Sequence, residues 1–301
     1  MIDIRNLTKR FGKITAVNDV SLQIENNQVF GLVGTNGAGK STLLRMVSGI
    51  LRQDAGSIEV SGQPVYDNPQ VRQDIFFIPD DPYFFRNGSA EDMRNFYRTV
   101  YPDFDPDRFD RLLRDFSLDP RRRIQNYSRG MKKQLAVLCG LCSNARYLLC
   151  DETFDGLDPV MRQAVKSIFA NDMDERGLTP VISSHNLREL EDICDHVGLL
   201  HGGGLLLSRD LASMKLGLQK VQCVFADQED AEKALSGLEL LNHDIRGRLH
   251  TLTIRASREE ILSRFDSLDM IFFELLPLTL EEIFISETEV IGYDIKNFIL
   301  N

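Results

Sequence analysis

The chain has 301 residues, 43% of them hydrophobic and 27% charged, which is the composition of an ordinary globular protein with room for about two domains. Its formal net charge of −10 argues against nucleic acid as a partner, because phosphate backbones are met by basic surfaces. No apolar run in the sequence reaches the ~20 residues that span a bilayer, and its first residues lack a signal-peptide pattern, so we expect a cytoplasmic protein. The five cysteines suit a reducing compartment, and the one close pair, Cys139 and Cys142, is expected to be buried in a helix.

Residues 2–24 alternate apolar and polar side chains, and this period of two predicts antiparallel strands. Phe11 lies within this segment, directly before a glycine. Its ring can belong to the core or can stack on a nucleotide base. From its position alone we favour the core, because most phenylalanines are buried.

Residues 34–42 read Gly-Thr-Asn-Gly-Ala-Gly-Lys-Ser-Thr, which fits the pattern G-x-x-x-x-G-K-[ST] of a phosphate-binding loop. An apolar run at 29–33 predicts a buried strand before it, and residues 41–50 predict a helix whose N-terminus faces the anion. Lys40 then reaches the β- and γ-phosphates, and the Ser41 hydroxyl ligates Mg²⁺. A glycine-rich turn with a chance Lys-Ser pair is the alternative, and the flanking strand and helix argue against it. The loop residues expected to bind nucleotide are Gly34, Asn36, Gly37, Ala38, Gly39, Lys40, Ser41 and Thr42.

The next segment changes from strand to helix. Strands are predicted at 57–60 and 75–78, and the second ends at a Pro-Asp-Asp-Pro run, residues 79–82. Three aromatic residues at 83–85 follow and belong either to the core or to a surface that grips a partner. Beyond them, capping signals and a helical period predict a helical subdomain at about 86–146. Its helices are expected near 90–100, 106–116 and 129–145.

Two carboxylates, Asp151 and Glu152, follow a predicted buried strand at 147–150. Ligands of open α/β sheets bind at the carboxyl ends of parallel strands. Asp151 can hold Mg²⁺ through its water shell, and Glu152 can orient or deprotonate the attacking water. A solvated strand end is the alternative, and the phosphate loop upstream makes it the poorer account. His185 follows a second predicted strand, at 180–183, and is a candidate γ-phosphate contact, although a lone histidine is more often structural.

Beyond about residue 212 the pattern of helices and strands changes. Strand-like and helical segments follow one another in the order βαββαβ, which is the ferredoxin-like arrangement. This part carries no cluster of chemically active residues, so we expect a small α+β domain for contact or regulation. The predicted domains are therefore 1–211 and 212–301.

Four further motifs, in order along the chain, make it resemble the ATP-binding subunits of ABC transporters. Tyr-Ser-Arg-Gly-Met at 127–131 resembles their signature motif, usually Leu-Ser-Gly-Gly-Gln. Leu-Leu-Cys-Asp-Glu at 148–152 looks like the Walker B strand with its following glutamate. Gly-Leu-Asp-Pro at 156–159 is similar to the D-loop, and His185 to the switch histidine. The resemblance spans about residues 1–211, and its specificity comes from the order of the motifs.

The resemblance implies an α/β fold of the P-loop NTPase class and ABC ATPase type, with a mainly parallel core sheet, an antiparallel β subdomain and a helical subdomain. Two such domains sandwich two ATP molecules head to tail, so ATP and Mg²⁺ are the implied cofactors. By this similarity Ser128 and the backbone of Gly130 contact the γ-phosphate across the dimer, and Asp158 communicates between the two sites. Phe11 becomes the adenine-stacking residue, which replaces the core interpretation.

The implied partners are a second ATPase subunit, in a homodimer or a heterodimer, and a separate transmembrane permease. Through that permease the chain would lie at the inner face of the cell membrane. The Ser-Arg-Gly-Met-Lys-Lys run at 128–133 and the segment 280–284 look most like bacterial exporter-type ATPases with small C-terminal extensions.

The sequence departs from the family pattern at two places near the chemistry. Asp80 stands where the Q-loop glutamine is usual. Its carboxylate can still approach Mg²⁺, so Asp80 stays a catalytic and metal-binding candidate, but it adds negative charge and cannot donate a hydrogen bond to water. Arg129 replaces a signature glycine, and we favour a solvent-facing side chain over one that adds positive charge near the nucleotide.

The leading hypothesis is an ATPase subunit that powers a separate permease, in export. One alternative is a soluble ABC-type ATPase that acts on an assembly or regulatory partner without transport. Another is a nucleotide-binding module with negligible hydrolysis, suggested by Asp80 and Arg129.

Overall fold

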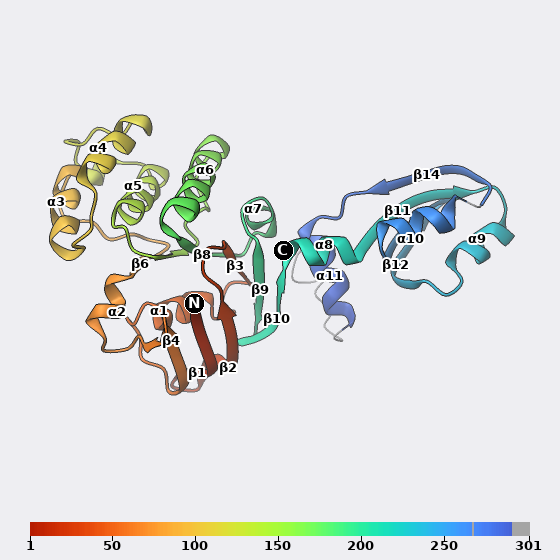
Figure 1. The fold of residues 1–301 in the computed structure, drawn as a ribbon, viewed down its shortest axis with the longest axis horizontal. Coiled ribbons are helices and arrows are strands. Elements are labelled where there is room, and N and C mark those ends of the chain that lie inside the picture. The colour runs from red at the N-terminus through yellow and green to blue at the C-terminus, as the bar shows by residue number, and fades with distance from the viewer. Residues whose placement is uncertain (267, 291–301) are drawn as a thin grey trace. The chain divides into compact units, whose positions relative to one another are not determined.

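A six-stranded sheet forms the centre of the N-terminal part of the computed structural model, which describes residues 1–266 and 268–290 (Figure 1). Its strand order is β10-β9-β3-β8-β7-β6, and the neighbours from β9 to β6 pair in parallel. Every residue of β3, β7 and β8 is buried, as expected of parallel strands covered on both faces. The predicted parallel core sheet is confirmed. The strands are Phe30–Val33 (β3), Ile75–Ile78 (β6), Tyr147–Asp151 (β7), Thr179–Ser184 (β8), His196–His201 (β9) and Gly204–Asp210 (β10).

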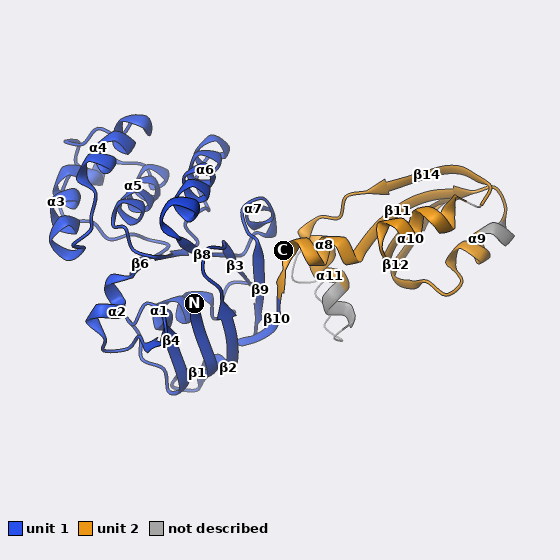
Figure 2. Ribbon diagram, viewed as in Figure 1, with its two compact units in different colours: residues 1–208 blue, residues 209–301 orange. Residues whose placement is uncertain are grey.

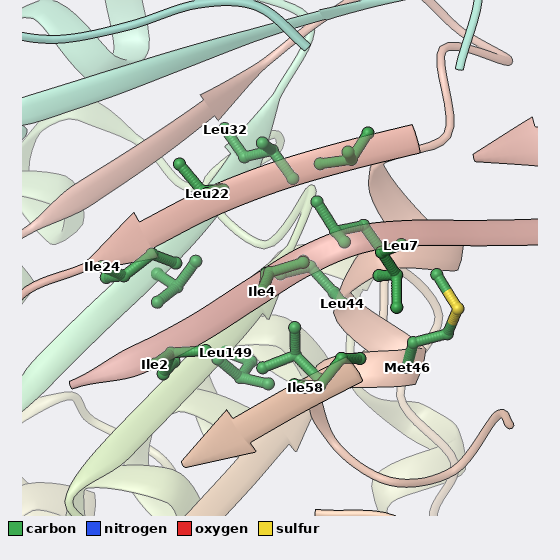
Figure 3. Close-up of a cluster of buried hydrophobic side chains, with 14 of the residues drawn as sticks. Ile2, Ile4, Leu7, Leu22, Ile24, Leu32, Leu44, Met46, Ile58 and Leu149 are labelled. Carbon is green, nitrogen blue, oxygen red and sulfur yellow. The ribbon is translucent and has the colours of Figure 1, made fainter. Parts of the chain in front are cut away.

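A smaller antiparallel sheet packs over the first helix, α1, Lys40–Val47. Its strands are Ile2–Phe11 (β1), Ile14–Ile24 (β2), Ala55–Val60 (β4) and Gln63–Pro64 (β5), in the order β2-β1-β4-β5. Figure 3 shows Ile4 of β1, Leu44 of α1 and Leu149 of β7 in one cluster of buried side chains. Because the period-2 apolar face of β1 supplies this cluster, the predicted antiparallel strands at 2–24 are confirmed.

The helices of the first part begin at residues that cap them. Ser89 and Asp92 form a reciprocal capping box at the start of α3, and Asp105 accepts a hydrogen bond from the N–H of Arg108 at the start of α4. Helices α3, α4 and α5 lie together as the predicted helical subdomain (Figure 1). The remaining helical bounds are Pro69–Gln73 (α2), Ala90–Val100 (α3), Pro106–Asp115 (α4), Ile124–Asn126 (a 3-10 turn), Arg129–Cys142 (α5), Pro159–Arg176 (α6) and Leu187–Glu191 (α7).

Helix α5 ends three residues earlier than predicted. Ser143 caps it, and Asn144 has a φ of 55°, which a helix does not continue through. Cys139 and Cys142 are buried on this helix, as predicted. Burial raises the pKa of Cys139 well above its ordinary value and that of Cys142 to about 12, so both thiols stay protonated near neutral pH.

The chain divides into two units, residues 1–208 and 209–301 (Figure 2). Each unit has its own hydrophobic cluster. The second unit contains an antiparallel sheet in the order β12-β13-β11-β14. The two central strands, β11 and β13, are the first and third of this sheet in chain order. This is the ferredoxin-like order, and that prediction is confirmed. Its elements are Leu211–Gly217 (α8), Leu218–Phe225 (β11), Gln228–Leu235 (α9), Glu239–Arg246 (β12), Leu249–Arg255 (β13), Arg258–Phe265 (α10), Met270–Leu276 (β14) and Leu280–Val290 (α11). Among the described residues, no helix combines the length and the apolar character that a membrane crossing requires.

A buried carboxylate ties the helical subdomain to the longest helix of the first unit. Asp172 of α6 accepts from Arg108 of α4 at 2.6 Å and from Arg176, one turn along α6, at 2.8 Å. Arg176 also donates to the Ala145 carbonyl at 2.9 Å. Since the Asp172 side chain is only 2% exposed, these two guanidinium groups replace the hydration that its carboxylate loses on burial.

Asp172→Ala should destabilise the first unit, because it leaves two guanidinium groups without their shared anion. We expect the free energy of unfolding to fall by about 2–4 kcal/mol, less than for fully buried pairs, since the Arg108 and Arg176 side chains are 20% and 19% exposed. Urea denaturation followed by circular dichroism measures this. Asp174→Ala, an exposed position on the same helix, is the control. An equal loss of unfolding free energy in the two variants would contradict the stabilising role of Asp172.

Candidate active site

The phosphate loop joins the end of β3 to α1, and its backbone geometry requires glycine. Gly39 lies directly before α1 with a φ of 105°. A Cβ atom there would lie 2.3 Å from the Ala16 carbonyl oxygen, so no side chain fits. Gly37 also has a positive φ, of 83°, which other residues rarely adopt. Glycine at these two positions therefore gives the loop a backbone turn that other residues rarely adopt, which lets its N–H groups approach a phosphate closely.

The remaining predicted loop residues lie around this turn. A Cβ atom at Gly34 would lie 2.6 Å from a backbone oxygen of β9, so the loop also packs closely at its start. Ala38 is buried, and its N–H donates to the Thr35 carbonyl at 3.1 Å. Asn36 is exposed, and Thr42 is half-buried in the first turn of α1. The loop thus has one packed side and one side open to a ligand.

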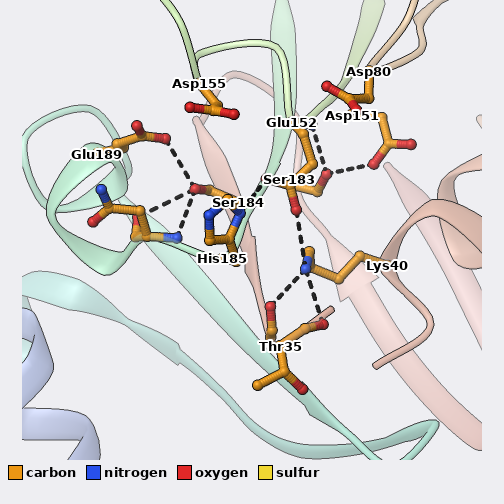
Figure 4. Close-up of polar contacts among 12 residues, drawn as sticks. Thr35, Lys40, Asp80, Asp151, Glu152, Asp155, Ser183, Ser184, His185 and Glu189 are labelled. Atoms are coloured by element: carbon orange, nitrogen blue, oxygen red, sulfur yellow. Dashed lines mark hydrogen bonds and ion pairs between the residues drawn. The ribbon is translucent and has the colours of Figure 1, made fainter. Parts of the chain in front are cut away.

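Lys40 folds back over the loop that precedes it. Its Nζ donates to the carbonyl oxygens of Gly34 and Thr35 at 2.6 and 3.2 Å. The same ammonium lies 3.1 Å from Oε1 of Glu152, whose other oxygen, Oε2, lies 2.7 Å from Nδ1 of His185 (Figure 4). The Lys40 and Glu152 side chains are only 5% and 14% exposed. The structure therefore brings three of the predicted site residues together around one shielded carboxylate.

Asp151 ends β7 and collects hydroxyl groups on one of its oxygens. Its Oδ1 accepts from Ser41 Oγ at 2.9 Å and from Ser183 Oγ at 2.7 Å. Ser183 reaches it because β7 and β8 pair in parallel with Asp151 opposite Ser183. All of these donor atoms are oxygen, the ligand type that Mg²⁺ prefers. Among the described residues, no three His, Cys, Asp or Glu side chains form a cluster suited to a metal. A cation at this place would therefore take ligands from Ser41 and Asp151 and the rest from phosphate and water, as Mg²⁺ commonly does.

Glu152 has an unusual backbone that its neighbours hold on both sides. Its φ is 48°, in the left-handed region that is costly for a residue with a side chain. Its N–H points to the carbonyl oxygen and to Oγ of Ser183, at 3.2 and 3.1 Å. Its own carbonyl oxygen accepts from Lys133 Nζ at 2.5 Å. The peptide groups before and after the side chain are thereby fixed.

Asp80 follows the end of β6 and contacts two cations. Its Oδ1 accepts from Lys133 Nζ at 2.9 Å and from the Arg129 guanidinium at 3.2 Å. Partial burial raises the pKa of Asp80, but the hydrogen bond and charge of Lys133, with a contribution from Arg129, outweigh it and hold the pKa below its ordinary value. Arg129 is 69% exposed, as expected, yet its guanidinium is not free in solvent but bonds Asp80. The catalytic and metal-binding role of Asp80 stays a prediction.

The signature and D-loop residues lie at two helix starts. Ser128 caps α5 by accepting from the Met131 N–H at 3.2 Å, and Asp158 caps α6 by accepting from the Met161 N–H at 2.9 Å. A Cβ atom at Gly130 would lie 3.1 Å from a backbone oxygen of the D-loop, so the two segments touch. None of these contacts involves the phosphate loop of the same chain, and the roles of Ser128, Gly130 and Asp158 stay predictions.

Phe11 ends β1 and does not lie in the core. Its side chain is 49% exposed, and the Lys9 ammonium lies 5.6 Å from the ring centroid. The core interpretation, which its position alone favoured, is therefore wrong. The exposed ring is available for stacking, and its contact with adenine stays a prediction.

Sequence reasoning missed two residues of the site, Ser183 and Lys133. A signal existed for each. Ser183 is a polar residue that follows the apolar run of β8, two residues before His185. Polar residues at the carboxyl end of a parallel strand mark the edge of the sheet where ligands bind. Lys133 lies four and seven residues before Val137 and Gly140, on the buried face of α5, and a charged residue on such a face requires a partner.

The sequence of this chain is similar to those of ABC transporter ATP-binding proteins. The family model described as ABC transporter matches residues 17–155. The ABC transporter ATP-binding protein YtrB of Bacillus subtilis (strain 168) is 31% identical over 287 residues, which is 95% of this chain and 98% of YtrB. The lantibiotic transport ATP-binding protein SrtF of Streptococcus pyogenes is 32% identical over 70% of this chain and 91% of its own length. The similarity to YtrB therefore extends through both units.

Solved structures share the fold of the first unit. The structure of an ATP binding subunit of an ABC transporter gives a TM-score of 0.66 at 24% identity, covering 71% of this chain and 92% of that one. The dimeric post-hydrolysis cassette MJ0796 bound to ADP and Pi gives 0.63 at 19% identity, covering 70% and 99%. At these identities the likeness identifies the fold, and the predicted fold class is confirmed.

Gly39→Ala should weaken ATP binding, because the added Cβ meets the Ala16 carbonyl oxygen and the backbone has a positive φ. Since strain of this kind costs roughly 1–3 kcal/mol, we expect affinity to fall about 5- to 150-fold. Titration with a fluorescent ATP analogue measures it. Gly204→Ala is the control, because its nearest contact would be at 3.7 Å and its φ is not positive. Unchanged affinity in Gly39→Ala would mean that the loop does not hold the phosphates.

Proposed function

Because this chain belongs to the ABC transporter family of ATP-binding proteins, with 31% identity to YtrB over 95% of its own length, we propose how its site hydrolyses ATP. It is an ATP-binding and ATP-hydrolysing subunit of an ABC transporter. One observation carries the proposal for the site. The Glu152 carboxylate meets Lys40 with one oxygen and His185 with the other.

The phosphate loop and Lys40 bind the triphosphate. Backbone N–H groups of the loop surround the β-phosphate, and the Lys40 ammonium reaches the β- and γ-phosphate oxygens. Ser41 and Asp151 would hold Mg²⁺, supported by their shared hydrogen bond and by Ser183. When bound, Mg²⁺ neutralises the charge that develops on the phosphate oxygens. Oδ1 of Asp80 is taken by two cations, which leaves its Oδ2 for the predicted contact with the water shell of the metal.

Glu152 serves as the general base. Phosphate oxygens compete with its Oε1 for the Lys40 ammonium, so binding of ATP frees this carboxylate to face a water molecule. The water gives a proton to Glu152 as its oxygen bonds to the γ-phosphorus, and the bond from that phosphorus to the β,γ-bridging oxygen breaks to release ADP. His185, which contacts the second carboxylate oxygen, fixes the direction of the base and approaches the γ-phosphate.

The chain acts in a dimer of ATPase subunits together with a membrane permease. In the arrangement we propose, the signature of one subunit closes over the ATP of its partner, in either a homodimer or a heterodimer. Ser128 and Gly130 stand at the start of the 14-residue helix α5, whose N-terminal end favours an anion. Asp158, beside them at the start of α6, would connect the two sites. The exposed ring of Phe11 would stack on adenine.

We propose that the transporter exports its substrate and that this subunit lies at the inner face of the cell membrane, on its permease. The names of two relatives support this direction. One is the lipopolysaccharide export ATP-binding protein LptB of Haemophilus influenzae, 28% identical over 76% of this chain, and the other is SrtF, named for lantibiotic transport. These names also favour transport over action on a non-transport partner.

Glu152→Gln should bind ATP normally and hydrolyse it at least about 100-fold more slowly, because the amide cannot take a proton from water. Steady-state phosphate release measures the rate. Light scattering after size exclusion should find a dimer with ATP that persists, because the bound γ-phosphate is not lost. Glu175→Gln, the same change at an exposed position of α6, is the control. A turnover rate equal to that of the control would remove Glu152 from its role.

The tagged chain should co-purify with a polytopic membrane protein when cells are extracted in mild detergent. The expectation follows from its family, in which the ATPase subunit is coupled to a permease. Mass spectrometry of the purified complex identifies the partner. Recovery of only a non-membrane partner would favour the assembly ATPase instead.

A further inference from the structure

A buried lysine contacts the backbone of Glu152 and the side chain of Asp80. Lys133 is in the second turn of α5, and its side chain is 1% exposed. Its Nζ donates to the Glu152 carbonyl oxygen at 2.5 Å and to Asp80 Oδ1 at 2.9 Å. These two acceptors follow β7 and β6, which are neighbours in the parallel sheet. A single ammonium group thus connects α5 to the ends of two strands.

The anion that balances this ammonium is Asp80. A buried ammonium is costly unless an opposite charge and hydrogen bonds replace its hydration. The Glu152 carbonyl supplies only a dipole, whereas Asp80 supplies a full negative charge, and its side chain is 48% exposed. Asp80 therefore keeps contact with water while it neutralises Lys133. A neutral glutamine at residue 80 would leave Lys133 buried without this counter-ion.

The contact with Lys133 also holds the backbone of Glu152. Glu152 has a φ of 48°, a conformation that persists only when its surroundings hold it. Ser183 holds the N–H side of the residue, and Lys133 holds the carbonyl side. With both peptide groups fixed, the side chain projects toward Lys40 and His185 (Figure 4).

We propose that Lys133 is a positioning residue for ATP hydrolysis, which acts through the Glu152 carbonyl, and that Asp80 serves as its counter-ion. The inference rests on the proposed role of Glu152 as the general base. It also accounts for the departure from the family pattern, because an aspartate at residue 80 and a lysine at residue 133 are needed together. Restoring the usual glutamine at residue 80 should therefore harm this protein.

The test measures kcat and KM for ATP in full-length variants. Lys133→Met keeps the length of the side chain and removes the ammonium, and we expect kcat to fall about 10- to 100-fold, as for a misdirected catalytic group, with KM changed less than about threefold. Lys132→Met removes the same charge one residue away and should leave kcat unchanged. A Lys133→Met variant with the kcat of Lys132→Met would overturn the proposal.

Asp80→Gln and Asp80→Glu form a matched pair of equal size that differ in charge. Asp80→Glu keeps the counter-ion on a half-exposed side chain and should retain kcat within about threefold, whereas Asp80→Gln should lose kcat as Lys133→Met does. In the Lys133→Met background, Asp80→Gln should cost nothing further, because the two changes break one interaction. The comparison is made at saturating Mg²⁺, which compensates for any lost contact between Asp80 and the water shell of the metal, and losses in kcat that multiply under these conditions would reject the counter-ion role.

Two measurements keep the outcome interpretable. Thermal denaturation and ATP titration confirm that each variant is folded and binds nucleotide, and if Lys133→Met does not fold, the Asp80→Gln and Asp80→Glu pair decides the question. Glu152→Gln is assayed in parallel. If Glu152→Gln hydrolyses ATP normally, the proposed base is wrong; if it is inactive while Lys133→Met is normal, only the positioning role fails.

Discussion

The ATP hydrolysis that we propose depends on how Glu152 is held. Its carboxylate contacts Lys40 and His185, and its peptide groups are bonded to Ser183 and Lys133. These partners come from α1, the end of β8 and α5, which are far apart in the sequence. A left-handed backbone at a residue with a side chain costs roughly 1–3 kcal/mol, so it persists only because several elements hold it at once.

The parallel sheet is what brings these elements together. β3, β8 and β7 are adjacent and parallel, so their carboxyl ends lie along one edge. The phosphate loop follows the first, His185 the second and Glu152 the third. A polar side chain that ends any of these strands therefore lies near the others, and this is the physical reason why parallel α/β sheets bind ligands at that edge.

Buried charge connects the helical subdomain to the rest of the first unit. Lys133 of α5 reaches Asp80 and Glu152, and Arg108 of α4 reaches Asp172 of α6. Buried ion pairs add little net stability compared with apolar packing, but each penalises any arrangement that separates its partners. In our proposal, the position of α5 and the direction of the Glu152 carboxylate are consequently linked.

Much of this protein is determined by short-range sequence patterns. The phosphate loop, the buried strands, the capped helices and the βαββαβ order of the second unit follow from residues that are close in the chain, whose period and turn chemistry act locally. Tertiary structure alone decided that Arg129 pairs with Asp80 and that Lys133 bonds Glu152. Such contacts join segments that only packing brings together, and the cost of burying a charge selects the partner after the fold has placed both groups.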